Sequence, residues 1–317
     1  MKTLVTGAAG FIGSTLTEAL LQRGDHVIGL DNFNDYYDLA RKRANVASFQ
    51  DHPNYTLHKA DFRDKDSVDD IFDKHKPDCV AHIGAMASVR YSINHPHIYI
   101  ETNIGGTHNL LDAAREHQVN NFVFASTSSV YGQTDKIPFV ETDPTDHPLA
   151  VYPASKKSCE VLGHAYHNLF DLNFTALRFF NVYGPKGRPD MMPYIVIDSI
   201  LKEKEITLFD DGEMHRDWTF IDDIIQGVVA ALDTPLGYEI INLGRGEPVL
   251  MRDFIQIAEE IVGKQAIIKA TPAPRTEPKI TYANIEKARQ LLNYKPQTSV
   301  VDGMNKFWAW YQQEVMS

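Results

Sequence analysis

The stretch KTLVTGAAGFIGSTLTEALLQRG, residues 2–24, carries the first structural signal of the chain. Its opening KTLVT is a short apolar run typical of a buried strand, and FIGSTLTEALLQ has helical periodicity that stops at Gly24. Gly7, Gly10 and Gly13 lie between the strand and the first turn of the helix. A tight, closely packed turn would also use such glycines. In this context, however, a glycine turn lets backbone N–H groups and the helix N-terminus meet a diphosphate, which predicts a dinucleotide-binding unit.

Short apolar runs alternate with helical patterns through the first half of the chain. HVIGLDN, YTLHKADF, PDCVAHIGA, NNFVFASTS and NFTALRFFNVYGP favour strands, whereas DSVDDIFDKHK, HPHIYIETNIGGTHNLLDAAREH and YPASKKSCEVLGHAYHNLF favour helices. This alternation predicts an α/β protein with a doubly wound parallel sheet, covered by helices on both faces. After about residue 182 the alternation loosens. Shorter strands such as EIINLG and AIIKA, with helices such as MRDFIQIAEEIVG, predict a smaller C-terminal α/β region.

Composition excludes several classes of partner. The chain has 317 residues and a net charge of −11, so it repels nucleic acid and anionic membranes. No apolar stretch approaches the roughly 18 residues needed to span a bilayer. Glycines interrupt the N-terminal apolar run, unlike the core of a signal peptide. Two cysteines, Cys79 and Cys159, make no disulfide framework, so we expect a reduced, cytoplasmic protein.

Two acidic residues follow the second and third predicted strands. Asp31 lies at the end of HVIGLDN, where a carboxylate accepts hydrogen bonds from ribose hydroxyls and repels a 2′-phosphate. This favours NAD over NADP. Asp61 is placed either to approach the adenine or to cap the following helix. The residues expected to contact the cofactor in these turns are Gly7, Gly10, Phe11, Ile12, Gly13, Asp31, Asn32, Asp61 and Phe62.

Hydroxyl side chains end the fifth predicted strand, and a tyrosine–lysine pair follows. Residues 126–129 in ASTSSVYG lie where doubly wound sheets bind ligands, although polar turns use the same residue types. Tyr152 and Lys156 in YPASK are four residues apart and share one face of a predicted helix. An ammonium and an oxidised nicotinamide both favour the phenolate of tyrosine, whose ordinary pKa is about 10. The pair predicts a tyrosine acid/base assisted by a lysine.

Together these motifs resemble the extended short-chain dehydrogenase/reductases of the nucleotide-sugar epimerase and dehydratase branch. The resemblance covers essentially the whole chain and is carried by TGAAGFIG, LDN, ASTSSVYG, YPASK, RFFNVYGP and RDWTFIDD. It implies a Rossmann-type NAD-binding domain over residues 1–181, which contains the tyrosine–lysine helix. Residues 182–317 would mainly bind the substrate, with the chain crossing back between the two domains. Tyr152 would be the catalytic acid/base, Lys156 would lower its pKa and hold the nicotinamide ribose, and Thr127 would bind the reacting sugar oxygen.

The resemblance also implies contacts to a sugar nucleotide and to a second subunit. Asn181 and Arg216 match positions that contact the substrate diphosphate, and Arg275 and Glu277 in PRTEP fall where the family contacts the nucleotide. PRTEP departs from the family's Arg-x-Gly-Asp pattern, so the match of Arg275 and Glu277 to the family's positions could be shifted by one residue. The family further implies a homodimer, in which the helices over residues 96–117 and 152–170 pack against their copies as a four-helix bundle.

The identity of the sugar depends on a few positions. At this place sugar 4,6-dehydratases have a motif similar to STDEVYG, and UDP-glucuronate decarboxylases have one similar to STSEVYG. The matching residues of this chain are Ser128 and Ser129, which carry no carboxylate. GPKGRPDMMPY and ASVRYSINHP resemble segments of UDP-glucuronate 4-epimerases, in which Arg90 or Arg188 would supply charge near the sugar carboxylate or order its loop. Asn181 instead matches galactose-type epimerases, since many glucuronate epimerases carry threonine there.

We therefore expect NAD-dependent 4-epimerisation of UDP-glucuronate to UDP-galacturonate through a transient 4-keto sugar. A UDP-glucose or UDP-N-acetylglucosamine 4-epimerase is the alternative, followed by a dehydratase, a decarboxylase or an inactive NAD-sensing scaffold. His164, His167 and Glu160 have the spacing of metal ligands on one helix face, but this chemistry needs no metal, so no metal site is expected.

Overall fold

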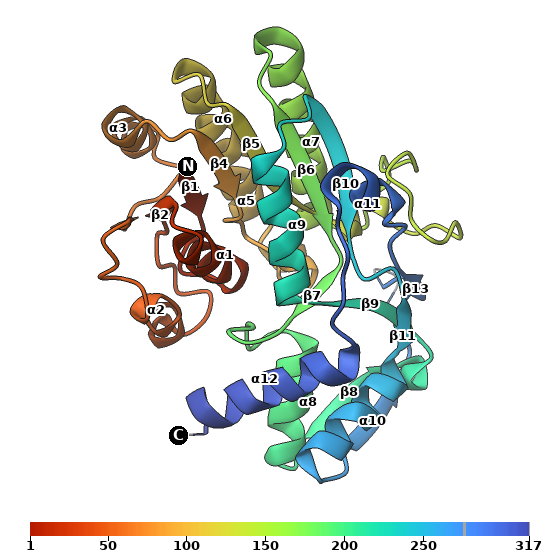
Figure 1. Ribbon diagram of the computed structural model, residues 1–317. Coiled ribbons are helices and arrows are strands. Elements are labelled where there is room, and N and C mark those ends of the chain that lie inside the picture. The colour runs from red at the N-terminus through yellow and green to blue at the C-terminus, as the bar shows by residue number, and fades with distance from the viewer. Residues whose placement is uncertain (275–276, 317) are drawn as a thin grey trace.

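The main sheet has seven parallel strands. The computed structural model describes residues 1–274 and 277–316, and the strand order is β10-β6-β5-β4-β1-β2-β3 (Figure 1). Every neighbouring pair runs parallel, so the predicted fold class is confirmed. The strands are β1 Lys2–Thr6, β2 His26–Leu30, β3 Tyr55–His58, β4 Cys79–His82, β5 Asn121–Thr127, β6 Phe174–Phe179 and β10 Tyr238–Leu243.

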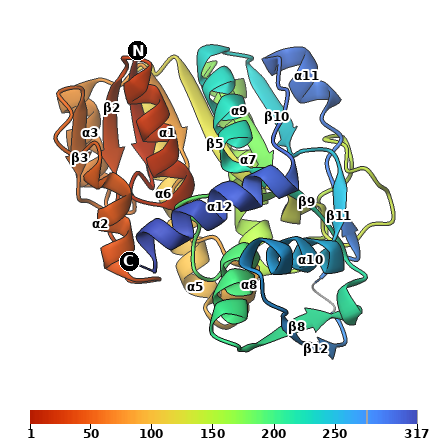
Figure 2. The same ribbon diagram turned by 60° about the horizontal axis from the view of Figure 1, so that its bottom comes forward.

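Helices cover both faces of this sheet. α1 and α9 pack together on one face, and α3, α6 and α7 lie on the other (Figures 1 and 2). Every residue of β5 and β6 is buried, which explains their continuous apolar runs. No helix of the described residues combines the length and apolar character needed to cross a bilayer. The elements are α1 Phe11–Gln22, α2 Leu39–Ala47, α3 Lys65–His75, α4 Val89–Asn94, α5 Pro96–Tyr99, the π-helical η1 Ile100–Gly105, α6 Gly106–Glu116, the 3-10 turn η2 Ser128–Tyr131, α7 Val151–Phe170 and α9 Ile221–Asp233.

A smaller set of elements gathers beyond the carboxyl ends of the main strands (Figure 2). β9 pairs with β7, β11 and β13, and β8 pairs with β12 as a separate parallel ribbon. Helices α8, α10 and α12 pack around these strands. The remaining elements are β7 Asn181–Tyr183, α8 Met192–Leu201, β8 Glu205–Phe209, the 3-10 turn η3 Asp210–Gly212, β9 His215–Phe220, β11 Pro248–Leu250, α10 Met251–Val262, β12 Ile267–Thr271, β13 Ile280–Thr281, α11 Glu286–Leu292 and α12 Val300–Glu314.

Two strand predictions were wrong, and both concern where the chain changes sheets. NFTALRFFNVYGP divides after Phe179, because β6 stays in the main sheet whereas β7 pairs with β9. EIINLG lies within β10, which pairs with β6 at the edge of the main sheet rather than among the smaller strands. The amphipathic helix α9 directly precedes β10 in the chain. It supplies the crossover that joins β10 to its parallel neighbour β6 as a βαβ unit.

A buried ion pair ties α7 to the main sheet. Arg178 of β6 donates to the carboxylate of Glu160 in α7 through Nε at 2.9 Å and Nη2 at 2.8 Å. Ser126 of β5 donates to the same carboxylate at 2.7 Å. Burial alone would raise the pKa of Glu160, but the hydrogen bonds and charge of Arg178 hold it below its ordinary value. The pair therefore stays ionised in the interior and joins α7 to two strands.

Removal of one partner should be costly. Arg178→Met should lower the free energy of unfolding by about 3–5 kcal/mol, because among the described residues it leaves the buried carboxylate only the longer ion pair with Lys157, at 3.4 Å. The loss should shrink at low pH, where Glu160 takes up a proton and the burial penalty on its charge disappears. The measurement is urea unfolding across pH, with Glu160→Gln/Arg178→Met as the matched control. A single variant no less stable than the double variant would contradict this account of the pair.

Candidate active site

The glycine turn between β1 and α1 forms one end of a cavity. Gly7 has φ +65°, a conformation that L side chains rarely adopt, and its carbonyl accepts a hydrogen bond from Gly10 N at 2.9 Å. A Cβ on Gly13 would lie only 2.1 Å from the Gly7 carbonyl oxygen. The helix therefore begins directly at the turn, from Phe11, and its first N–H groups have no acceptor within the helix. Such groups suit a diphosphate.

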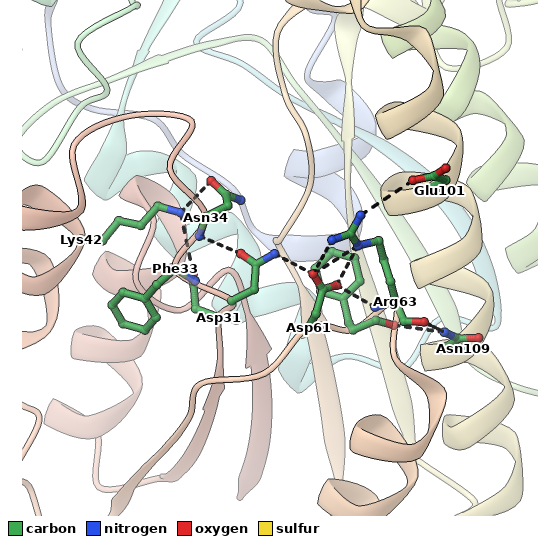
Figure 3. A network of polar contacts seen from close by, with 10 residues as sticks. Asp31, Phe33, Asn34, Lys42, Asp61, Arg63, Glu101 and Asn109 are labelled. Carbon is green, nitrogen blue, oxygen red and sulfur yellow. Dashed lines mark hydrogen bonds and ion pairs between the residues drawn. The ribbon is translucent and has the colours of Figure 1, made fainter.

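Asp31, at the end of β2, is fixed beside this turn. Its carboxylate accepts hydrogen bonds from the backbone N–H groups of Ala9 at 3.0 Å and Phe33 at 2.8 Å. The ammonium of Lys42 lies 3.8 Å from the same carboxylate and donates to the side-chain oxygen of Asn34 at 3.0 Å (Figure 3). Asp31 and Lys42 are both buried and both line the cavity. A carboxylate held in this way is ready to accept hydrogen bonds from ribose hydroxyls.

A second polar cluster borders the same end (Figure 3). Asn32 donates to the Asp61 carboxylate at 2.8 Å, and Arg63 donates to it at 2.8–3.1 Å while lying 3.8 Å from Glu101 of η1. Burial would raise the pKa of Asp61, but the hydrogen bonds from Arg63 and Asn32 lower it. The N-cap of α3 is Asp64, so Asp61 does not cap that helix. Asp61 instead orients Asn32, which lines the cavity.

The cavity has a volume of about 360 Å³ and extends from the glycine turn to the start of α7. Its walls come from several strands because the carboxyl ends of parallel strands meet at one edge of a sheet. The predicted site residues that line it are Gly7, Gly10, Phe11, Ile12, Gly13, Asp31, Asn32, Phe62, Thr127, Ser128, Ser129, Tyr152, Asn181 and Arg188.

Tyr152 lies in the first turn of α7 and faces the hydroxyl groups that follow β5. Against the effect of burial, hydrogen bonding with Thr127 acts to lower the pKa of Tyr152, and Oγ1 of Thr127 lies 3.2 Å from the hydroxyl of Ser129. Burial raises the pKa of Tyr152, and the Thr127 hydrogen bond and the charge of Arg188 only partly oppose that shift. The expectation was that Lys156 lowers this pKa. Burial instead dominates the shift, and the cation that acts on the phenol is Arg188.

Lys156 lies one turn further along α7, behind the cavity wall. Its side chain is buried, and its ammonium lies 4.3 Å from the ring centre of Phe124 in β5. Burial lowers the pKa of Lys156 to about 8, although the nearby charge of Glu160 acts in the opposite direction. Lys156 is therefore mostly charged at pH 7, yet it loses its proton far more readily than an exposed lysine.

Among the described residues that line the cavity, one guanidinium lies at the Tyr152 end. Arg188, in the loop between β7 and α8, donates to the carboxylate of Asp190 through Nε at 2.9 Å and Nη2 at 2.8 Å. The amide of Asn181, the first residue of β7, lines the same wall. This end thus combines a phenol, hydroxyls, an amide and a paired cation.

Three other predicted residues form a separate group. Glu277 accepts hydrogen bonds from Arg216 of β9 at 3.0 Å and from Arg90 of α4 at 3.3 Å. Arg216 is largely buried, whereas Arg90 is exposed. None of the three lines the cavity formed by the described residues. Arg275, which was predicted beside Glu277, lies outside the described residues.

Comparison with known proteins identifies the family. The model of the NAD dependent epimerase/dehydratase family matches residues 3–244. The chain belongs to this family. The UDP-glucuronate 4-epimerase of Thermodesulfobacterium geofontis is 41% identical over 314 residues, which cover 98% of this chain and 96% of that protein. The predicted family is therefore confirmed.

Solved structures agree with this membership. The crystal structure of UDP-glucuronic acid 4-epimerase from Bacillus cereus, in complex with UDP-glucuronic acid and NAD, has a TM-score of 0.93 and 38% identity, and 99% of each chain is covered. The UDP-glucose 4-epimerase of Thermotoga maritima, with UDP-glucose, has a TM-score of 0.89 and 29% identity, again over 99% of each chain. Members with different sugars in their names thus share one architecture.

The sequence patterns missed part of this family member's cavity. Asn34, Tyr36, Tyr37 and Lys42 line it from the loop after β2 and from α2. Their signal was the run of polar and aromatic residues that directly follows the strand ending near Asp31. A second set of missed residues lies in the loop after β4. This loop follows the carboxyl end of a parallel strand, which is where such sheets bind ligands, and that position could have indicated it. The set comprises Ile83, Gly84, Ala85, Met86 and Ala87.

The residues with metal-like spacing have other contacts. His164 and His167 pack against Tyr238, with ring centres 4.9 Å and 6.4 Å from it, and Glu160 pairs with Arg178. Within the described part of the chain, no three His, Cys, Asp or Glu side chains are grouped to hold a metal ion. These side chains serve packing and the ion pair.

The lowered pKa of Lys156 makes a prediction about stability. Its charge is penalised in the folded protein, so wild-type stability should be lowest below pH 8 and should rise toward pH 10.5, the ordinary pKa of lysine. Lys156→Met should therefore stabilise the protein without cofactor by up to about 3 kcal/mol at pH 7, from 1.36 kcal/mol per pKa unit. The gain should vanish above pH 10.5.

Chemical unfolding at several pH values measures this difference. Lys204→Met, at an exposed position, is the control and should give a difference that does not change with pH. A pH-independent effect of Lys156→Met would show that the ammonium is not penalised by burial.

Proposed function

We propose that this family member converts UDP-glucuronate to UDP-galacturonate. The proposal is carried by the make-up of the cavity around Tyr152, where Thr127, Ser128, Ser129 and Arg188 also lie. Among the described residues that line the cavity, the only carboxylate is that of Asp31, at the opposite end. Elimination of water requires an acid/base carboxylate near the sugar, whereas epimerisation requires only proton and hydride transfer. The names of the relatives from T. geofontis and B. cereus support the same reaction.

The cofactor end suits NAD. The glycine turn and the start of α1 would hold the diphosphate, Asp31 would accept hydrogen bonds from the adenosine ribose, and Lys156 would hold the nicotinamide ribose. When bound, NAD supplies a hydride acceptor for C4 of the sugar and then the donor that returns the hydride to the opposite face. Asp31 is buried and accepts two backbone N–H groups, so it is fixed where a 2′-phosphate of NADP would be repelled.

The proton is moved by Tyr152. Its phenolate takes the proton of the C4 hydroxyl, and Thr127 holds the same sugar oxygen by a hydrogen bond. The phenol returns the proton after the sugar has turned over. Because burial raises the pKa of Tyr152, its ionisation depends on positive charge nearby, and Arg188 supplies part of that charge.

The substrate carries a chemical hazard. Its 4-keto form has a carboxylate on C5, so it is a β-keto acid and can lose CO₂. An epimerase must hold this carboxylate in an orientation that does not assist the loss. Ser128 and Ser129 would hold it through hydroxyl groups, and Arg188 would supply the charge.

The nucleotide would remain anchored while the sugar turns. We assign this role to Asn181, Arg216, Glu277 and Arg275, with the last beyond the described residues. Arg216 is held by Glu277 in a largely buried place, which favours a fixed contact to a diphosphate. On this assignment residues 1–181 mainly bind NAD and residues 182–317 mainly bind the sugar nucleotide, with β10 crossing back to the first group.

One observation favours a neutral sugar instead. The guanidinium of Arg188 is already paired with Asp190, which reduces the net charge that it offers to a carboxylate. A UDP-glucose or UDP-N-acetylglucosamine 4-epimerase would use the same Tyr152 and Thr127. The likeness to the UDP-glucose 4-epimerase of T. maritima supports this second candidate.

The deciding experiment offers UDP-glucuronate, UDP-glucose and UDP-N-acetylglucosamine separately and identifies the products by NMR. We expect UDP-galacturonate from UDP-glucuronate and much slower turnover of the neutral sugars. Turnover of a neutral sugar alone would transfer the function to the second candidate. UDP-pentose as the main product would indicate a decarboxylase, and NAD binding without any turnover would indicate an inactive scaffold.

Tyr152→Phe is the matched control for this experiment. It should retain the binding of NAD and UDP-glucuronate but lose roughly 10²–10⁴-fold in turnover, since only the proton-transfer group is removed. Near-normal turnover by this variant would assign the proton transfer to another residue.

We also propose that the protein is a homodimer through η1–α6 and α7. Four large apolar side chains on these helices are exposed, namely Ile100, Val161, Leu169 and Phe170. Val161 and Leu169 are eight residues apart in α7 and so lie within one helical stripe. Exposed apolar residues gathered on adjacent helices favour a partner helix of the same kind, and two copies of each helix make a four-helix bundle.

Charge in this stripe should dissociate the dimer. Val161→Glu/Leu169→Glu should sediment as a monomer at micromolar concentration, where the wild type sediments as a dimer. Ile267→Glu, at an equally exposed apolar residue of β12, is the control and should leave the dimer intact. A wild-type monomer, or a double variant that still dimerises, would overturn this interface.

A further inference from the structure

Three segments meet beside Tyr152. They are the loop after β2, the loop between β7 and α8, and the helix α4. Tyr36, from the first loop, lines the cavity together with Arg188 from the second. The ring of Tyr36 also packs edge-on against Tyr91 of α4, with ring centres 5.1 Å apart. Residues of the first and the second half of the chain therefore close the cavity together at this place.

The contact between the two loops consists of three interlocked side chains. The hydroxyl of Tyr36 donates to Oδ2 of Asp190 at 2.9 Å, across 154 positions of the sequence. Asp190 also accepts both hydrogen bonds from Arg188, at 2.9 Å and 2.8 Å. The guanidinium of Arg188 in turn lies 5.6 Å from the ring centre of Tyr36. We call Tyr36, Asp190 and Arg188 the clasp.

The clasp limits where the guanidinium can point. Asp190 occupies the edge formed by Nε and Nη2, and the guanidinium lies over the ring of Tyr36, so both partners restrict the directions of its remaining N–H groups. Arg188 and Tyr152 line the same cavity, and the charge of Arg188 acts against burial to lower the pKa of that phenol. Among the described residues that line the cavity, Arg188 is the one cation at this end. A shift of Tyr36 or Asp190 would therefore move that cation.

We propose that Tyr36 and Asp190 are positioning residues that aim Arg188 at the carboxylate of the sugar, so that the clasp selects the acidic substrate and preserves its 4-keto form. The inference rests on the proposed function. Asp190 holds Arg188 without neutralising all of its donors, because a guanidinium has five N–H groups and the carboxylate accepts two of them. A substrate carboxylate can then bind to donors that are already oriented.

The clasp has a chemical consequence for the intermediate. If the carboxylate is released from Arg188, the bond between C5 and the carboxylate can break, and CO₂ leaves. The electron pair left on C5 is delocalised into the 4-keto group and then takes up a proton, which gives a UDP-4-keto-pentose. Each UDP-4-keto-pentose that is released before the hydride returns to C4 leaves one reduced nicotinamide, whereas return of the hydride would give a UDP-pentose and restore the oxidised cofactor. A loosened clasp should therefore divert turnover from UDP-galacturonate to these products.

Tyr36→Phe tests the proposal because it removes one hydroxyl and keeps the ring. In the Tyr152→Phe background, which prevents turnover, it should weaken UDP-glucuronate binding about 10-fold and leave UDP-glucose binding unchanged, as measured by calorimetry. In the active enzyme it should raise the ratio of CO₂ to UDP-galacturonate at least several-fold. The near-ultraviolet absorbance of reduced nicotinamide should increase in step with the released UDP-4-keto-pentose.

Two controls separate aiming of Arg188 from general loosening. Tyr91→Phe removes a neighbouring hydroxyl that makes no hydrogen bond among the described residues. Glu18→Gln weakens the ion pair with Lys186, 2.9 Å long, which attaches the same second loop to α1 without touching Arg188. Both variants should match the wild type in UDP-glucuronate affinity and in product ratio.

Each outcome decides the proposal. If Tyr36→Phe matches the two controls while the wild type epimerises UDP-glucuronate, the clasp has no positioning role and only this inference fails. If Tyr36→Phe weakens UDP-glucose binding equally, the tyrosine supports the fold of the loop rather than the carboxylate contact. If the Tyr152→Phe protein does not bind UDP-glucuronate, the proposed function and the clasp are both overturned.

Discussion

The buried ion pair between Glu160 and Arg178 is the interaction on which the geometry of the active site depends. A helix packed on a sheet by apolar contacts alone can shift slightly at small cost, since cores accept modest repacking. The carboxylate of Glu160 accepts three hydrogen bonds from two strands, and it cannot move without breaking them in a buried place. Lys156 and Tyr152 lie one and two turns earlier on the same helix, so the pair fixes both relative to the sheet. Such anchoring matters because misplacement by about 1 Å can cost a large factor in rate.

Electrostatics in this acidic chain relies on a few cations in places that water does not screen well. Lys42 and Arg188 supply positive charge at the two ends of one cavity, and Lys156 lies behind its wall, although the net charge of the chain is −11. Lys42 and Lys156 are buried, whereas the side chain of Arg188 is partly exposed. Burial strengthens the effect of each charge on its neighbours, but it also raises the pKa of Tyr152 and lowers that of Lys156. The same desolvation therefore makes the phenol a worse base and the cations more effective. The phenol depends on positive charge from Arg188 and from an oxidised nicotinamide, so its ionisation is tied to the presence of the cofactor.

Local signals in the sequence predicted the parts of the site that lie within one strand–turn–helix unit. The glycine turn, the place of Asp31 and the position of Tyr152 and Lys156 one turn apart on one helix follow from spacing, because a helix or a turn places nearby residues without help from the rest of the chain. Sequence could not place β10 in the main sheet or divide β6 from β7, since strand pairing depends on partners far along the chain. The clasp escaped prediction for the same reason, because Tyr36 and Asp190 are joined only by the folded structure. The direction of the pKa shift at Tyr152 also depends on burial, which no spacing reveals.

The distribution of these residues separates the chemistry from the choice of sugar. Tyr152, Lys156 and Thr127 belong to a helix and a strand that the buried ion pair holds rigidly, and on the proposed reaction they treat C4 of every hexose alike. Arg188 lies instead on a loop that belongs to neither sheet, and side-chain contacts from Tyr36 and Glu18 attach this loop to the first half of the chain. A change in that loop can alter the charge offered to C5 without disturbing the proton-transfer groups. On the proposed function, the sugar would thus be chosen outside the scaffold that this chain shares with a UDP-glucose 4-epimerase at 29% identity.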